Sequence, residues 1–162
     1  MKKILHVTLG NPEYKLGGVN RYCKELMNWQ KADGYQPLLL YPGSFFHSKH
    51  PKITRKKENE FEISTPERYT VASDIKRYAK WLEYMQPQII HVHSFQGIHR
   101  EFFIAARNRR IPILYTSHDY FPLCIKGVLF DRSGTVCDGR ASEKCALCNR
   151  NVGLSVNTQR II

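Results

Sequence analysis

Short apolar segments alternate along this chain with longer segments in which apolar residues recur every three or four positions. The short segments predict buried strands at residues 4–9, 37–41, 61–64, 88–93 and 113–116. The helical periodicity predicts helices at residues 19–33, 72–85 and 98–110. The polar and basic residues 44–59 predict an exposed loop. Strands separated by helices of this length indicate an α/β fold, a Rossmann-like parallel sheet with helices on both faces.

The alternation of strand and helix stops after Asp119. Residues 122–162 contain few apolar positions, two turn signals and most of the cysteines. We therefore expect one domain, in which residues 1–121 form the Rossmann-like part and residues 122–162 a Cys-rich appendage. A chain of 162 residues is long enough to bury a core of its own.

The hydropathy of the chain bears on its location. No apolar run approaches the roughly 20 residues that cross a bilayer, and the first apolar run is too short for a signal peptide. The expected location is the cytoplasm.

A formal charge of +11 narrows the range of partners. Such a surface attracts anions, although solvated lysines on a soluble protein would give the same count. The basic residues concentrate at 49–57 and 107–110, which favours contact with the inner face of an anionic membrane or with an anionic substrate. No nucleic-acid-binding motif is present, so we do not expect a nucleic-acid partner.

A glycine pair, Gly17 and Gly18, stands between the first predicted strand and the first predicted helix. Glycine permits close approach of a ligand to backbone N–H groups, and a helix start favours an anion. The spacing is not that of the dinucleotide-binding fingerprint, and a simple turn is the alternative reading.

Histidines follow or end two of the predicted strands. His118 and Asp119 come after the strand at 113–116, where His118 could donate a hydrogen bond to a sugar or phosphate or make only a turn contact. We assign His91 and His93 to opposite faces of their strand. His93, followed by Ser94, is then the candidate site residue, and His91 is expected to be structural.

Four of the five cysteines lie in the appendage, at Cys124, Cys137, Cys145 and Cys148. The Cys145-x-x-Cys148 pair has a spacing typical of zinc, and clustered thiols in the cytoplasm hold a metal more often than they form disulfides. A structural zinc is the leading hypothesis, with a disulfide or redox role and unligated thiols as alternatives. The fifth, Cys23, is expected in the core.

Taken in order, these segments resemble the amino-terminal half of a GT-B glycosyltransferase of the retaining family 4. The resemblance rests on Gly17-Gly18-Val19, on the run 89–94 and on the run 115–120, and it covers about residues 3–150. A subgroup of that family also carries Leu-Cys after His-Asp and a later Cys-x-x-Cys, as this chain does at Leu123-Cys124 and Cys145–Cys148.

The resemblance implies transfer of a sugar from a nucleotide-sugar donor to a saccharide or lipid-linked acceptor in cell-surface polysaccharide synthesis, without a catalytic cofactor. Gly17 and Gly18 would approach the donor diphosphate, and His118 would contact the transferred sugar. The residues implied for the acceptor are Asn11, Arg21, His93 and Ser94.

Complete family members have a second domain with a Glu-x₇-Glu signature, which this sequence lacks. We therefore expect the chain to be inactive without such a donor domain. Two alternatives are a non-enzymatic binding module for an anionic sugar or nucleotide and a zinc-stabilised interaction protein.

Overall fold

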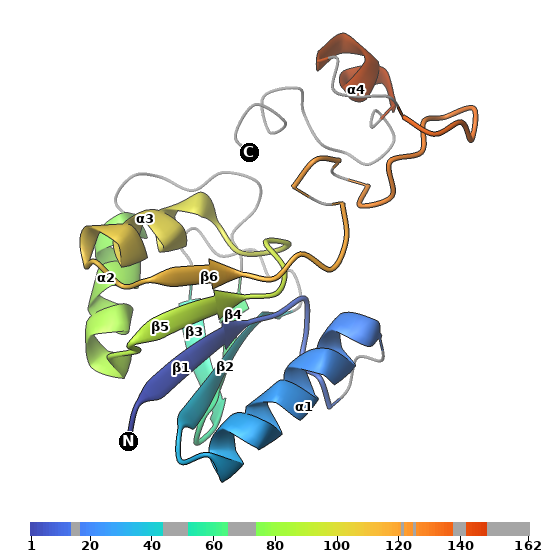
Figure 1. Cartoon of the computed structure of the whole chain (residues 1–162). Coiled ribbons are helices and arrows are strands. Elements are labelled where there is room, and N and C mark those ends of the chain that lie inside the picture. The colour runs from blue at the N-terminus through green and yellow to red at the C-terminus, as the bar shows by residue number, and fades with distance from the viewer. Residues whose placement is uncertain are drawn as a thin grey trace. The chain divides into compact units, whose positions relative to one another are not determined.

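The computed structural model divides into two units, Met1–Thr116 and Ser117–Ile162 (Figure 1). The residues that the structure describes are 1–13, 17–43, 52–64, 74–120, 122–124, 126–137 and 142–148. The division lies close to the predicted boundary between the Rossmann-like part and the appendage.

The first unit is built on one six-stranded sheet with the strand order β3-β4-β2-β1-β5-β6. Its strands are β1 (Lys3–Val7), β2 (Gln36–Pro42), β3 (Lys52–Lys57), β4 (Glu60–Ser64), β5 (Ile89–Val92) and β6 (Ile113–Tyr115). All neighbouring pairs are parallel except β3 and β4, which are antiparallel. The predicted α/β fold with a largely parallel sheet is confirmed.

The expectation that residues 44–59 form a loop is wrong for residues 52–57, which make strand β3. Its basic sequence lacks a strong apolar signal, because β3 is an edge strand with mostly exposed side chains. Ile53 packs on the main core, while Lys56 and Lys57 form ion pairs with Glu62 and Glu60 of β4. Cross-strand contacts with β4 thus stabilise β3, although its sequence shows no hydrophobic periodicity that would predict a strand. Residues 44–51 lie outside the described part.

Three helices cover the two faces of the sheet, as predicted, with bounds within two residues of those expected (Figure 1). They are α1 (Gly18–Ala32), α2 (Asp74–Met85) and α3 (Arg100–Asn108). Helix α1 lies on one face, and α2 and α3 pack together on the other, where Tyr78 and Phe102 meet edge to face at 5.6 Å.

The alternation of side chains along each strand gives the two faces different characters. On the side of α2 and α3, β1 contributes Leu5 and Val7, and the neighbouring strands add further apolar residues to the main core. On the side of α1, the small cluster of Cys23, Leu39 and Tyr41 is the only apolar core found among the described residues. The α1 side therefore has room for polar groups.

The second unit contains an isolated bridge between Phe130 and Val136 and the short helix α4 (Ser142–Cys148), which the sequence pattern did not predict. The predicted turn at 133–134 is present, since the Asp131 carboxylate accepts hydrogen bonds from the backbone N–H of Ser133 and of Thr135. The other predicted turn, at 138–139, falls outside the described residues.

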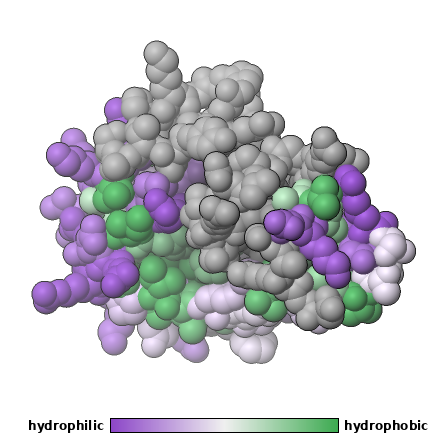
Figure 2. All heavy atoms as spheres, turned by 90° about the horizontal axis from the view of Figure 1, so that it is seen from above, coloured by the Kyte–Doolittle hydropathy of each residue, from purple (hydrophilic) through white to green (hydrophobic). Residues whose placement is uncertain are grey.

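A shallow groove of about 540 Å³ runs beside α3 and β6. In Figure 2, apolar side chains border hydrophilic ones on the side of the molecule where Figure 1 shows α2 and α3. The groove combines three arginines with an apolar lining, and its residues are Arg100, Phe103, Ile104, Arg107, Arg110, Ile111, Pro112 and Ile113. Among the described helices, none is long and apolar enough to span a bilayer.

Candidate functional site

The carboxyl ends of β1 and β5 meet at one edge of the sheet, because these strands are parallel neighbours with His6 opposite His91. Just beyond β5, the His93 N–H donates to the carbonyl of Val7, the last residue of β1, at 2.8 Å, which extends the pairing past the end of β5. Open α/β sheets bind ligands at this edge. Predicted site residues from the β1–α1 segment and from the end of β5 are thereby brought to the same edge.

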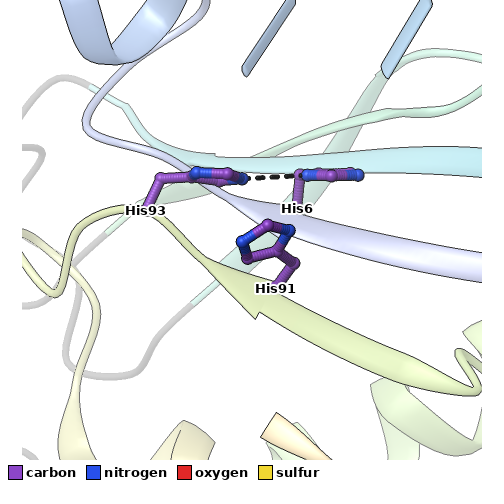
Figure 3. Close-up of side chains that lie close together, drawn as sticks. All are labelled: His6, His91 and His93. Carbon is purple, nitrogen blue, oxygen red and sulfur yellow. Dashed lines mark hydrogen bonds between the residues drawn. The ribbon is translucent and has the colours of Figure 1, made fainter. Parts of the chain in front are cut away.

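Three buried histidines stand together on the α1 side of the sheet (Figure 3). His6 Nδ1 and His93 Nε2 are 3.0 Å apart, and the ring centroids of His91 and His93 are 4.1 Å apart. The assignment of His91 and His93 to opposite faces is therefore wrong. Residues two apart in a strand share a face, and His93 continues the direction of β5.

Each end of this cluster is held by a neighbouring polar group. His6 Nε2 lies 2.7 Å from the amide oxygen of Gln30 on α1, and His91 Nε2 lies 2.8 Å from the hydroxyl oxygen of Thr116. Because an amide oxygen only accepts, His6 carries its proton on Nε2, and its Nδ1 accepts from the Nε2–H of His93. A hydrogen-bond chain thus runs from α1 through β1 to the end of β5.

Burial keeps His6 uncharged near neutral pH. Desolvation lowers the pKa of His6 to about 4, against a smaller opposing effect of the hydrogen bond to Gln30. Proximity to His91 lowers it further. Neutral imidazoles are both hydrogen-bonding groups and metal ligands, so this cluster is chemically versatile.

Helix α1 begins at the glycine pair, and glycine has no side chain that could cover the backbone there. Gly17 has φ 154° and ψ 154°, a conformation open almost only to glycine, and a Cβ built at Gly17 or Gly18 meets nothing within 4 Å. The helix start has no side-chain cap and no acidic residue in its first turn. Among the described residues, neither a capping side chain nor a carboxylate of the first turn offsets the positive end of the helix dipole there.

The residues implied for the acceptor differ in their surroundings. Arg21 is exposed on α1 and pairs with Glu25 at 3.0 Å. Asn11 and Ser94 are buried and shape their own loops, since Asn11 Oδ1 accepts from the Glu13 N–H and Ser94 Oγ from the Gln96 N–H. Their roles toward a ligand stay predictions.

His118 belongs to the second unit and is partly buried there. Beside it, the Ser117 hydroxyl donates to the Asp119 carbonyl at 3.1 Å, and the Tyr120 N–H donates to the Gly127 carbonyl. These local bonds order the segment that follows β6.

The four cysteines of the second unit are partly buried, and none of these four described residues forms a disulfide. Lys126 Nζ lies 3.8 Å from Cys148 Sγ. Within the described ranges, no three of these thiols come as close together as the ligand atoms of the histidine cluster do. The donor set suits zinc, but the thiols are not gathered into a site, so we derive no chemistry through a metal there.

Sequence reasoning missed the partners that complete the histidine cluster, namely His6, Gln30, Thr116 and Tyr22. The Tyr22 ring lies edge-on to His93 at 5.8 Å. A signal for His6 was present, because a polar residue between Leu5 and Val7 in a buried strand must face the side opposite to theirs.

Comparison with known proteins identifies the family to which the chain is similar. The family model described as Glycosyltransferase Family 4 matches residues 16–145. No curated protein matches the chain significantly.

Three solved structures are similar to the chain. Sucrose-phosphate synthase from Thermosynechococcus elongatus is 14% identical with a TM-score of 0.44, over 73% of this chain and 33% of that one. MurG from Acinetobacter baumannii is 11% identical with a TM-score of 0.45, over 71% and 34%. The S. aureus MnaA–UDP structure is 15% identical with a TM-score of 0.40, over 72% and 29%.

Likenesses this weak say nothing about activity, and the chain spans about a third of the length of these structures. The family model, in contrast, covers well over half of the chain, including the glycine pair at the start of α1, His91 and His93, and the His118-Asp119 pair. It confirms the resemblance inferred from the ordered motifs. The chain belongs to glycosyltransferase family 4.

Proposed function

We propose that this chain is the acceptor-side domain of a retaining glycosyltransferase, which moves a sugar from a nucleotide-sugar to a saccharide or lipid-linked acceptor in cell-surface polysaccharide synthesis. The observation that carries the proposal is the family match over residues 16–145, which includes an unobstructed glycine start of α1. Because the chain spans only about a third of similar solved structures, the activity is assigned to the complete protein. This domain alone is expected to be inactive.

The proposed donor contact is made by backbone rather than by side chains. Among the described residues, no atom lies within 4 Å of a Cβ built at Gly17 or Gly18, so a diphosphate can come close to this backbone. The first turn of α1 carries no carboxylate that would repel it. The positive end of the dipole of this 15-residue helix favours such an anion. Stabilising the negative charge that develops on the departing phosphate is the kind of electrostatic work that lowers the barrier to sugar transfer.

His118 is the proposed residue that contacts the transferred sugar. An imidazole can donate a hydrogen bond to a sugar hydroxyl or to the leaving phosphate as charge builds up there. Asn11, Arg21, His93 and Ser94 are proposed to border the acceptor. Arg21, as the exposed cation among them, is suited to an acceptor phosphate, and the buried three to fixing the shape of the edge.

The test uses the complete protein and a panel of nucleotide-sugars. His118→Ala should lower turnover by about a hundredfold or more while far-UV circular dichroism stays unchanged. His99→Asn, which alters a histidine at the start of α3, serves as the matched control and should retain activity. Unchanged turnover in His118→Ala would remove this residue from the mechanism.

A second candidate function is binding of an anionic sugar or nucleotide without transfer, which the glycine start of α1 would serve equally well. In that case the complete protein would bind a nucleotide-sugar without consuming it. Consumption of donor with formation of a glycoside, with the anomeric configuration followed by NMR, decides for the transferase.

We also propose a peripheral contact with an anionic membrane through the groove beside α3 and β6, where Arg107 and Arg110 border apolar residues. The basic segment 49–57 is less suited than its sequence suggests, because Lys56 and Lys57 are paired with carboxylates. Arg107→Glu combined with Arg110→Glu should abolish flotation with vesicles containing phosphatidylglycerol. The matched reversal of Lys24 and Lys31 on α1 should not, and equal loss in both would disprove a specific contact.

A further inference from the structure

The buried histidine cluster offers one nitrogen from each of His6, His91 and His93 within 4.8 Å of one another. We propose that it binds a single divalent ion of the zinc, cobalt or nickel type. This inference is independent of the glycosyl-transfer reaction and of the cysteines in the second unit. It concerns only residues of the first unit (Figure 3).

The outer nitrogens of two rings are already held as ligating histidines require. A metal-bound imidazole usually gives its second N–H to a fixed acceptor, which orients the ring and sets its tautomer. Gln30 Oε1 takes this role for His6 at 2.7 Å, and Thr116 Oγ1 faces His91 Nε2 at 2.8 Å. In the proposed site, His6 and His91 would bind the ion through Nδ1 and His93 through Nε2.

The spacing is close to what a tetrahedral ion needs. His6 Nδ1 and His93 Nε2 are 3.0 Å apart and share one proton. Two nitrogens bound at about 2.0–2.1 Å in a tetrahedral site would stand slightly farther apart, so the ion replaces the shared proton after a small separation of the rings. His91, whose ring centroid is 4.1 Å from that of His93 and 5.4 Å from that of His6, supplies the third ligand, since its ligand atom already lies within 4.8 Å of the other two.

The donor chemistry decides which ions fit. Three imidazoles without a carboxylate favour borderline transition metals over magnesium or calcium, which prefer oxygen ligands. All three rings are buried, so the ion would sit under α1 and tie β1 to β5. The proposed role is therefore structural.

The number of protons released when a metal binds distinguishes this histidine site from a site made by cysteine thiols. Each ring binds as a neutral imidazole, so His93 moves its proton from Nε2 to Nδ1 and no proton leaves the protein. Cysteine ligands, in contrast, must lose their protons when they bind a metal. Binding that releases almost no protons at pH 7.5 thus identifies nitrogen ligands.

The experiment uses the full chain stripped of metal by a chelator and titrated with Co²⁺ and Zn²⁺. We expect the chain to retain an ion that is bound through nitrogen. With Co²⁺, the spectrum of that ion should show visible d–d bands and no thiolate charge-transfer band. X-ray absorption should give metal–nitrogen distances of about 2.0–2.1 Å. Failure to retain any ion, or binding through sulfur at about 2.3 Å alone, would overturn the proposal.

Variants add a second readout. Gln30→Leu, which removes only an orienting partner, should weaken binding at the nitrogen site by about 10–100-fold. His91→Phe should abolish it, while His99→Phe, on the other side of the sheet, should bind as the unchanged chain does. Equal affinity in Gln30→Leu and the unchanged chain would contradict the assigned geometry even if His91→Phe failed to fold.

Discussion

His6 shows how a polar residue is accommodated at a fully buried strand position. Its two ring nitrogens face Gln30 and His93, so burial leaves neither nitrogen without a partner. A buried polar atom that loses its partner costs about 1–3 kcal/mol, and charging the ring costs more because the surroundings are poorly solvating. The fold therefore accommodates His6 at this buried position only while the imidazole ring remains neutral.

Acid should destabilise the first unit through its buried histidines. In the folded chain burial lowers the pKa of His6 to about 4, and it also lowers the pKa of His99. Between pH 6.5 and 4 the unfolded chain binds more protons than the folded one, so the free energy of unfolding decreases as pH falls. The expected loss for His6 is about 1.4 kcal/mol per pH unit, and there should be no effect of this kind above pH 7.

Urea unfolding of chelator-treated protein between pH 7.5 and 5 measures this loss. His6→Asn, compared with the unchanged chain at each pH, should flatten the dependence even if its stability is lower throughout. Parallel pH curves for the two proteins would show that His6 is not the group responsible.

Alanine should have opposite effects at two glycines. Gly97 has φ +74°, and a Cβ there would lie 2.6 Å from the Cβ of Pro42, so Gly97→Ala should cost at least about 2 kcal/mol of unfolding free energy. Gly18 lies at the start of α1 with open space around it, so Gly18→Ala should be neutral or stabilising by up to about 1 kcal/mol. Thermal melting of both variants checks the pair, and equal destabilisation would contradict the backbone argument.

At the scale of elements, the pattern of apolar and polar residues predicted the strands and helices that bury an apolar face. Strands β1 and β2 and helices α1 and α2 follow from apolar runs and helical spacing. Strand β3 and helix α4 escaped prediction because none of their described side chains is fully buried, so their sequences carry little hydrophobic periodicity. Pairing with β4 supports β3, and no local pattern encodes a long-range pairing of that kind.

The candidate site was predictable only in part for the same reason. Gly17 and His93 could be found from their place after a strand, but His6 and Gln30 enter the cluster through β1–β5 register and through the packing of α1. Side chains alternate between the two faces of a strand, so His91 and His93, two residues apart, lie on the same face and not on opposite faces as predicted. When this alternation is applied to β1 and β5, all three histidines are expected on one side of the sheet.

Helix α1 should protect Cys23 from alkylation. The thiol is fully buried beneath α1, and burial raises its pKa to about 12, so its thiolate is about a thousandfold scarcer than that of an ordinary cysteine. Iodoacetamide at pH 8 should therefore modify the four partly buried cysteines of the second unit and leave Cys23 untouched until denaturant is added. Mass spectrometry locates the labels, and rapid labelling of Cys23 would mean that α1 does not pack as described.

At the scale of the whole molecule, the apolar core belongs to one unit. All members of both core clusters lie within Met1–Thr116, among the described residues. The described residues of Ser117–Ile162 are held by turns, a single bridge and a short helix, with partly or fully exposed side chains. The stability of the sheet should therefore be insensitive to changes in the four cysteines of the second unit.

Replacing Cys145 and Cys148 together by serine should separate the two units experimentally. Both tryptophans, Trp29 on α1 and Trp81 on α2, report only on the first unit, so the urea midpoint followed by fluorescence should stay unchanged. Proteolysis within residues 117–148 should become faster, because any structural role of these thiols, including zinc binding, stabilises that segment alone. If the tryptophan midpoint falls by as much as the protease resistance does, the two units unfold together. Slower proteolysis would instead show that the thiols do not stabilise the second unit.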